Sequence, residues 1–263
     1  MRTVGAGPLE SALRASRDRG RKLLLPYVTG GLDDRWTDVL RAVADAGADA
    51  IEVGIPFSDP AMDGPTIEEA SVRALARGTT PAGILGDLAA VDAGVPLVAM
   101  TYYNLVFRAG ELRFARSLAE AGVAGAIVPD LPLEESASWE REAAAAGVDA
   151  TLLAAPVTPD DRLREVAERS RGFVYAVSVM GITGARDRLA STAAVLAGRL
   201  KAITDRPVII GFGIATPEQA VVASAHADGV VVASALMRQR LDGASPEDLG
   251  ATVATFRAAL DRG

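Results

Sequence analysis

The sequence predicts an α/β protein, a single (β/α)8 TIM barrel with an extra N-terminal helix. Three observations predict this fold. Eight short apolar runs, rich in β-branched residues, alternate with segments of helical periodicity. The runs are continuously apolar, which indicates a parallel sheet covered on both faces. The length of 263 residues is that of one such barrel, which typically takes about 250 residues.

The expected elements follow one another in regular order. A leading helix over residues 8–18 has Leu9 and Leu13 four positions apart on one face. Strands are expected at residues 23–28, 50–55, 96–102, 125–130, 150–155, 173–178, 208–212 and 229–234. Helices are expected at residues 34–46, 81–92, 109–121, 134–146, 160–170, 189–204, 217–226 and 246–261. An open doubly wound sheet is the alternative, but no Gly-x-Gly-x-x-Gly follows the first strand, and eight regular units favour a closed barrel.

The expected helix ends carry local signals. Four Thr-Pro or Ser-Pro pairs predict an N-cap followed by proline at the first helical position. These pairs are Thr80-Pro81, Thr158-Pro159, Thr216-Pro217 and Ser245-Pro246. Glycines after the helices at 34–46, 109–121 and 134–146 predict turns into the next strand. No linker or shift in composition divides the chain, so we expect one domain over residues 1–263.

Composition excludes several classes of function. The chain has no cysteine, which excludes thiolate chemistry and fits a cytoplasmic enzyme. Its one histidine, His226, falls near a predicted helix end, where contact with helix-end carbonyls is the ordinary role. A zinc site is therefore close to excluded. The net charge of -7 and the scattered basic residues argue against a nucleic-acid partner, and we find neither a membrane span nor a secretory signal.

Two carboxylates lie near the end of the second expected strand, in the stretch IEVGIPFSDPAMDGPTI. Glu52 interrupts an apolar run, and alternation places Glu52 and Gly54 on one face. Asp63 follows in the loop, at the C-terminal ends of the strands where barrel active sites lie. A buried glutamate is costly unless paired, and neighbouring segments lack basic residues, which favours a functional role over a core ion pair. Asp63 alone is also explained by an ordinary Asp-Gly turn.

Three loops after the sixth, seventh and eighth expected strands suggest an anion site. They contain GITGAR, GFGIATP and ASALMRQ, and the last opens a short helical segment. Glycine allows close approach of the backbone to a phosphate, and helix N-termini offer free N–H groups. The glycines of any single loop could serve only to turn the chain. Together they favour an anionic ligand, because barrels often bind phosphate at these loops.

These motifs resemble those of the tryptophan synthase alpha chain family. The stretch IEVGIPFSDPAMDGPTI looks like the family signature, and PYVTGG, YYNLVF, VPDLPLEES, GITG and GFGIATPEQA follow the family's order on matching strands. The resemblance extends from about Leu9 to about Leu260. It implies a carbon–carbon lyase of tryptophan biosynthesis, which cleaves indole-3-glycerol phosphate by a retro-aldol reaction into indole and glyceraldehyde 3-phosphate.

The resemblance also implies roles for individual residues. Glu52 would be the acid–base catalyst, and Asp63 would accept a hydrogen bond from the indole N–H and stabilise the developing cation. Tyr175 matches the family's active-site tyrosine, and a barrel-core aromatic is its alternative role. Thr183 matches the threonine of a loop that closes over the substrate. The implied substrate-binding positions are Tyr27, Tyr102, Leu105, Asp130, Thr183, Gly184, Phe212, Gly213, Ser234 and Ala235.

Four residues depart from the family pattern. Ala233 replaces a common glycine after the eighth strand, and its amide can still donate to phosphate if φ is negative. Met62, in AM where LA is familiar, changes the loop but leaves both acids. Val179 and Met180 replace more polar residues after the sixth strand, which affects closure of that loop rather than the reaction.

The resemblance implies a partner and no cofactor for this chain. Family members join a pyridoxal-phosphate-dependent beta chain in a linear α2β2 complex, and indole passes through a tunnel between the two sites. PAMDGP and residues 101–110 are the expected contact loops, because both border the rim of the barrel. The alternatives are a stand-alone lyase that releases indole, a non-catalytic homologue that activates a beta chain, and a phosphosugar isomerase or epimerase on the same barrel.

Overall fold

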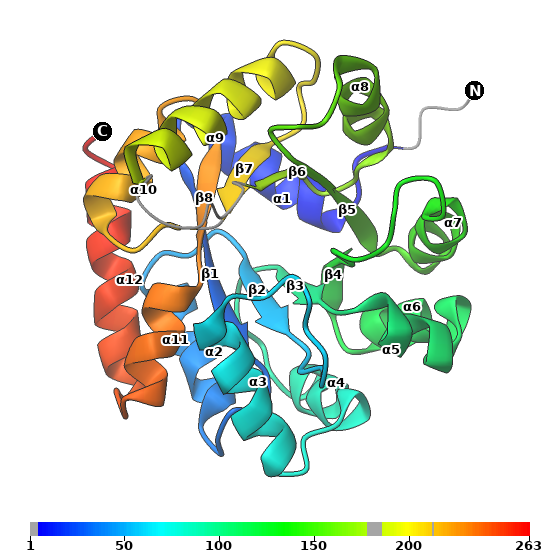
Figure 1. Ribbon diagram of the computed structural model, residues 1–263. Coiled ribbons are helices and arrows are strands. Elements are labelled where there is room, and N and C mark those ends of the chain that lie inside the picture. The colour runs from blue at the N-terminus through cyan, green and yellow to red at the C-terminus, as the bar shows by residue number, and fades with distance from the viewer. Residues whose placement is uncertain (1–4, 178–185, 212) are drawn as a thin grey trace.

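The computed structural model describes residues 5–177, 186–211 and 213–263. The strands within these ranges are β1 (Leu23–Thr29), β2 (Ile51–Gly54), β3 (Leu97–Met100), β4 (Val123–Ile127), β5 (Asp149–Ala154), β6 (Val174–Val177), β7 (Val208–Gly211) and β8 (Gly229–Val232). All neighbouring strands are parallel, and β8 pairs with β1 to close the barrel. Figure 1 shows the strands at the centre with helices around them, which confirms the predicted fold.

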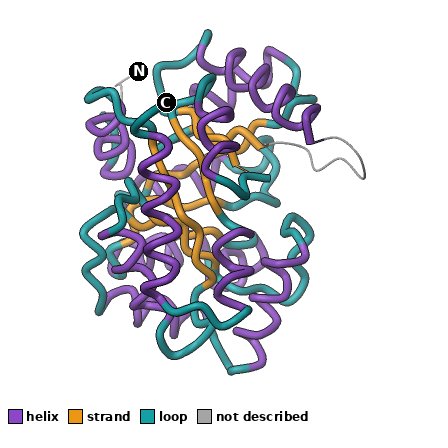
Figure 2. Tube along the Cα trace, turned by 90° about the vertical axis from the view of Figure 1, so that its left-hand side faces the viewer, coloured by secondary structure: helices purple, strands orange, loops and turns teal. Residues whose placement is uncertain are grey.

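The described helices form the outer layer of the barrel, as the side view in Figure 2 shows. They are α1 (Pro8–Arg17), α2 (Trp36–Asp45), α3 (Pro65–Ala76), α4 (Pro81–Ala89), α5 (Tyr103–Ala109), α6 (Glu111–Glu120), α7 (Ala137–Ala146), α8 (Asp160–Arg169), α9 (Arg186–Lys201), α10 (Pro217–Ser224), α11 (Ser234–Leu241) and α12 (Pro246–Leu260). None of these helices is long and apolar enough to cross a membrane.

Three of the four predicted N-caps are confirmed. The side chains of Thr80, Thr216 and Ser245 each accept a hydrogen bond from the amide three residues on. The prediction at Thr158 is wrong, because α8 begins at Asp160. The Thr158 hydroxyl instead accepts a hydrogen bond from the Ala155 amide at 3.1 Å, so it closes the preceding turn.

Two helices near the rim, α3 and α5, were not predicted. Helix α3 begins with a proline after Gly64 and buries Ile67, Ala70 and Ala74 on one face, a pattern that is visible in the sequence. Helix α5 has only 7 residues and buries Val106 alone, so it has no apolar periodicity to detect. Both follow strands that end earlier than expected, at Gly54 and Met100.

Helix α1 covers the N-terminal ends of the strands and confirms the predicted extra helix. Leu9 and Leu13 are fully buried. A Cβ atom on Gly125 or Gly172 would lie 2.5 or 2.6 Å from the Leu9 side chain, so these glycines admit Leu9 to the base of the barrel. The base is thereby sealed, and the opposite end of the barrel is left for ligands.

The N-terminus of α1 is capped by a residue that lies 139 positions later in the chain. The N-cap position is Gly7, which has no side chain. Asp149, the first residue of β5, accepts a hydrogen bond from the Glu10 amide at 2.9 Å. A Cβ atom on Gly7 would lie 1.8 Å from the Asp149 carboxylate. The carboxylate therefore takes the place of an N-cap side chain.

We expect Asp149→Ala to lower the free energy of unfolding by about 1–2 kcal/mol, because it removes this cap. Asp149→Asn keeps an acceptor oxygen and should lose less. Asp45→Ala, an exposed change on α2, is the control and should stay within about 0.5 kcal/mol of the wild type. Urea unfolding measures all three, and an Asp149→Ala variant as stable as the control would contradict the capping role.

Candidate active site

Glu52 is buried in the barrel wall with 1% of its surface exposed. In the register of the sheet it lies beside Tyr27 of β1 and Val98 of β3. Its Oε2 atom has no hydrogen-bond partner among the described residues. Burial, and then the negative charge of Asp63, raise the pKa of Glu52 to about 8. At neutral pH the side chain is therefore a neutral acid that can give up a proton.

Asp63 lies on the loop between β2 and α3, and it is half-buried. Burial raises the pKa of Asp63 to about 6, a hydrogen bond from the Tyr102 hydroxyl opposes this rise, and the charge of Glu68 adds to it. At neutral pH Asp63 is therefore ionised while Glu52 is protonated. Such a separation between two nearby carboxyl groups typically marks an acid and a fixed negative charge with different roles.

Tyr102 fastens the Asp63 loop to the barrel. Its hydroxyl accepts a hydrogen bond from the Met62 amide at 3.0 Å, and its interaction with Asp63 lowers the pKa of that carboxyl group. Its ring stacks on Phe57, with 5.2 Å between centroids and 25° between the ring planes. Phe57 carries no signal in the sequence, because this stacking joins two separate loops.

Two buried tyrosines lie against glycines of neighbouring strands. A Cβ atom on Gly54 would lie 1.8 Å from the Tyr27 hydroxyl, and one on Gly211 would lie 2.3 Å from the Tyr175 hydroxyl. Burial, followed by the charges of nearby acids, raises the pKa of both phenols; Asp63 leads among the charges for Tyr27 and Glu52 for Tyr175. Glycine inside an apolar strand often marks a close approach, and that signal was available in the sequence.

Five of the predicted site residues thus come together at one end of the barrel: Glu52, Asp63, Tyr27, Tyr102 and Tyr175. Two further predicted residues, Leu105 and Asp130, follow β3 and β4. Leu105 is half-buried on α5. Asp130 is exposed, and its Oδ1 accepts a hydrogen bond from the Tyr103 amide at 2.8 Å.

The expected anion-binding loops lie partly within the described residues. Gly213 has φ of +82°, a conformation that other residues rarely adopt. Ser234 and Ala235 are the first residues of α11, and the preceding Ala233 has φ of -114°. The condition for donation by the Ala233 amide, a negative φ, is met, and the first amides of a helix have no partner within it. Thr183, Gly184, Phe212, Val179 and Met180 lie outside the described residues.

The fold and these side chains define a class of protein: a (β/α)8 barrel whose C-terminal mouth carries a protonated glutamate and an ionised aspartate suited to acid–base chemistry. A family model described as tryptophan synthase alpha chain matches residues 13–257. The chain therefore belongs to the tryptophan synthase alpha chain family. Membership of this family implies a lyase role in tryptophan biosynthesis.

Individual relatives agree over nearly the whole chain. The tryptophan synthase alpha chain of Gloeobacter violaceus is 44% identical over 255 residues, covering 95% of this chain and 92% of its own. That of Thermobifida fusca is 41% identical, with 97% of each chain covered. Among solved structures, tryptophan synthase from Mycobacterium tuberculosis matches with a TM-score of 0.90 and 39% identity, over 98% of this chain and 100% of that one. The alpha subunit from Legionella pneumophila matches at 0.88 and 30%, with the same coverage.

The raised pKa of Glu52 predicts a pH-dependent difference in stability between the wild type and Glu52→Gln. The folded protein keeps a proton up to about pH 8, whereas an ordinary carboxyl group loses it near 4.5. Between these values the unfolded state binds fewer protons, so the free energy of unfolding falls as pH rises. The glutamine variant does not titrate there.

We therefore expect Glu52→Gln to gain stability relative to the wild type as pH rises from 5 to 8, by up to about 1.4 kcal/mol per pH unit. Above about pH 8, where Glu52 is ionised in both states, the difference should level off. Urea unfolding of both proteins across this range measures the difference. A constant difference would mean that the folded protein does not hold the Glu52 proton.

Proposed function

We propose that this chain cleaves indole-3-glycerol phosphate by a retro-aldol reaction into indole and glyceraldehyde 3-phosphate, as the alpha subunit of a tryptophan synthase. The observation that carries the proposal is the separation of the two acids, with the pKa of Glu52 at about 8 and that of Asp63 at about 6. The reaction needs a proton donor and a fixed negative charge at the same time. Burial of one acid and partial burial of the other supply both.

The reaction breaks the bond between indole C3 and the glycerol side chain. Protonated Glu52 gives its proton to C3, which leaves a positive charge on the ring. Asp63 accepts a hydrogen bond from the indole N–H and stabilises that charge, an effect typically worth about 3 kcal/mol in a closed site. The Glu52 carboxylate then takes the proton of the side-chain hydroxyl. The electrons of the hydroxyl O–H bond form the C=O bond of the aldehyde. The bond between C3 and the side chain breaks, and its electrons return to the ring.

Both ends of the substrate have matching groups. The phenols of Tyr27 and Tyr175, buried beside the acids, suit the walls of an indole pocket. The substrate phosphate would bind the amides at Gly213, Ser234 and Ala235, where the first turn of α11 presents N–H groups and a positive dipole end. Thr183, Gly184 and Phe212 complete this proposed set. Tyr102, Leu105 and Asp130 would border the pocket.

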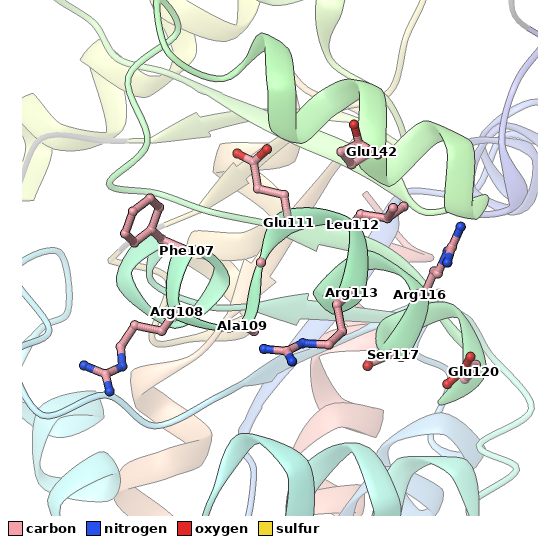
Figure 3. A pocket seen from close by; sticks show the side chains of 11 residues that line it. Phe107, Arg108, Ala109, Glu111, Leu112, Arg113, Arg116, Ser117, Glu120 and Glu142 are labelled. Atoms are coloured by element: carbon pink, nitrogen blue, oxygen red, sulfur yellow. The ribbon is translucent and has the colours of Figure 1, made fainter.

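A beta chain is the proposed partner, with pyridoxal phosphate carried by that chain. The two contact loops proposed from the sequence each expose an apolar side chain: Met62 is 41% exposed and Phe107 is 69% exposed. Phe107 borders a groove of about 900 Å³ between α5, α6 and α7. Figure 3 shows Phe107 and Arg108 at one end of this groove and Arg116 and Glu120 toward the other. Exposed apolar groups beside charged ones are common at protein interfaces.

The experiment that tests the proposal is release of glyceraldehyde 3-phosphate from indole-3-glycerol phosphate, with and without a matching beta chain. We expect slow release alone and at least an order of magnitude more with the beta chain. Fast release that the beta chain does not change would indicate a stand-alone lyase. No release under either condition would contradict the proposed reaction and leave a homologue that only binds a beta chain.

Substitutions at the two acids separate their roles. Glu52→Gln should abolish cleavage while binding of substrate persists, because the amide cannot exchange the proton. Asp63→Asn should reduce kcat strongly with a smaller loss of binding, because its negative charge acts in the transition state. Steady-state kinetics and equilibrium binding measure both effects. Turnover by Glu52→Gln, or an unchanged kcat in Asp63→Asn, would remove the residue from its proposed role.

A further inference from the structure

We propose that Tyr102 is a positioning residue, whose hydroxyl holds Asp63 in place and keeps it in its charged form. This inference rests on the proposed function for the importance of Asp63, but the contacts themselves do not depend on it. The resemblance to the alpha chain family implied only that Tyr102 borders the substrate pocket. The structure points to a more specific role, because the amide just before Asp63 donates to the phenol oxygen of Tyr102 and the same hydroxyl lowers the pKa of Asp63.

The Tyr102 hydroxyl can donate one hydrogen bond and accept others. A tyrosine hydroxyl has one proton to donate and lone pairs that can accept. The lone pairs of Tyr102 receive the Met62 amide at 3.0 Å, so its proton remains available to the Asp63 carboxylate, whose pKa the hydroxyl lowers. The same hydroxyl therefore fixes the backbone just before Asp63 and favours the charged form of the Asp63 side chain.

The Tyr102 hydroxyl is held by the barrel and not by the loop that carries Asp63. Tyr102 lies two residues after the end of β3 and is the N-cap residue of α5. Its ring is 4% exposed, and its carbonyl accepts the Leu105 amide at 3.0 Å. The next amide, that of Tyr103, donates to Asp130. Tyr102 therefore has a fixed position against which the exposed loop is aligned.

Several groups act on the charge of Asp63. Burial and the charge of Glu68 on α3 favour the protonated form, and the bond from Tyr102 favours the anion. From β2, Glu52 faces Asp63. From β1 and β6, Tyr27 and Tyr175 feel the Asp63 charge. The Tyr102 hydroxyl accepts the Met62 amide and so fastens the loop, and its loss should both release Asp63 and raise the pKa of Asp63.

The test compares Tyr102→Phe with Tyr103→Phe. The control removes the adjacent phenol, whose hydroxyl donates to Glu111 on α6 at 3.0 Å and does not touch the loop. The carboxyl carbon of Asp63, labelled with ¹³C and identified by its disappearance in Asp63→Asn, is titrated by NMR in each protein. Hydrogen exchange of the Met62 amide is followed in parallel. Neither readout requires lyase activity.

We expect Tyr102→Phe to raise the pKa of Asp63 above about 6 and to speed exchange at Met62, and Tyr103→Phe to change neither. A rise of one unit would lower the ionised fraction at pH 6 from about one half to about one tenth. In an active enzyme, kcat at pH 6 should then fall about five-fold more than kcat at pH 8. A structural role alone would lower kcat equally at both values.

If Tyr102→Phe shows the same Asp63 pKa and the same Met62 amide exchange rate as the wild type, the inference is overturned. Absence of cleavage by the wild type would overturn the proposed function and leave the NMR comparison intact. If Tyr102→Phe does not fold, Phe57→Leu provides a second variant, because it loosens the stacked ring and keeps the hydroxyl. It should change both readouts in the same direction and by less, and unchanged readouts there would count against the inference.

Discussion

Burial of the Glu52 carboxyl group in the wall of the barrel is the constraint on which the site depends. Burial and the charge of Asp63 raise its pKa, and no cation among the described residues opposes this rise. An ionised carboxylate in such surroundings is unfavourable by several kcal/mol, so the group stays protonated at neutral pH. The closed barrel that excludes water thereby makes an ordinary glutamate into a proton donor, without help from histidine or cysteine.

The second acid illustrates how a flexible connection can be given a defined geometry. Asp63 belongs to a loop with exposed neighbours such as Asp59 and Ala61, and a loop of this kind does not fix a side chain by itself. Phe57 and the Met62 amide bind the loop to Tyr102, which lies between β3 and α5. The site therefore combines an acid on a rigid strand with an acid on a fastened loop.

Much of the fold could be predicted from the sequence, because strand composition, helix caps and the length of each unit are local properties. Glu52 could be found for the same reason: a carboxylate stands out within a buried strand. The contacts that complete the site could not be predicted, because they join segments far apart in the chain. The approach of Tyr175 to Gly211 and the bond from the Met62 amide to Tyr102 follow from strand register and loop path, which the sequence does not state.

The cap on α1 has a consequence for the order in which the chain can fold. A helix of 10 residues is marginal in water when it is isolated, and its cap comes from a residue 139 positions further along the chain. During synthesis, more than half of the polypeptide must leave the ribosome before Asp149 can meet the amide of Glu10. The first helix of the chain is therefore expected to settle late, after β5 has joined the sheet, and closure of the base becomes a long-range event that slows folding.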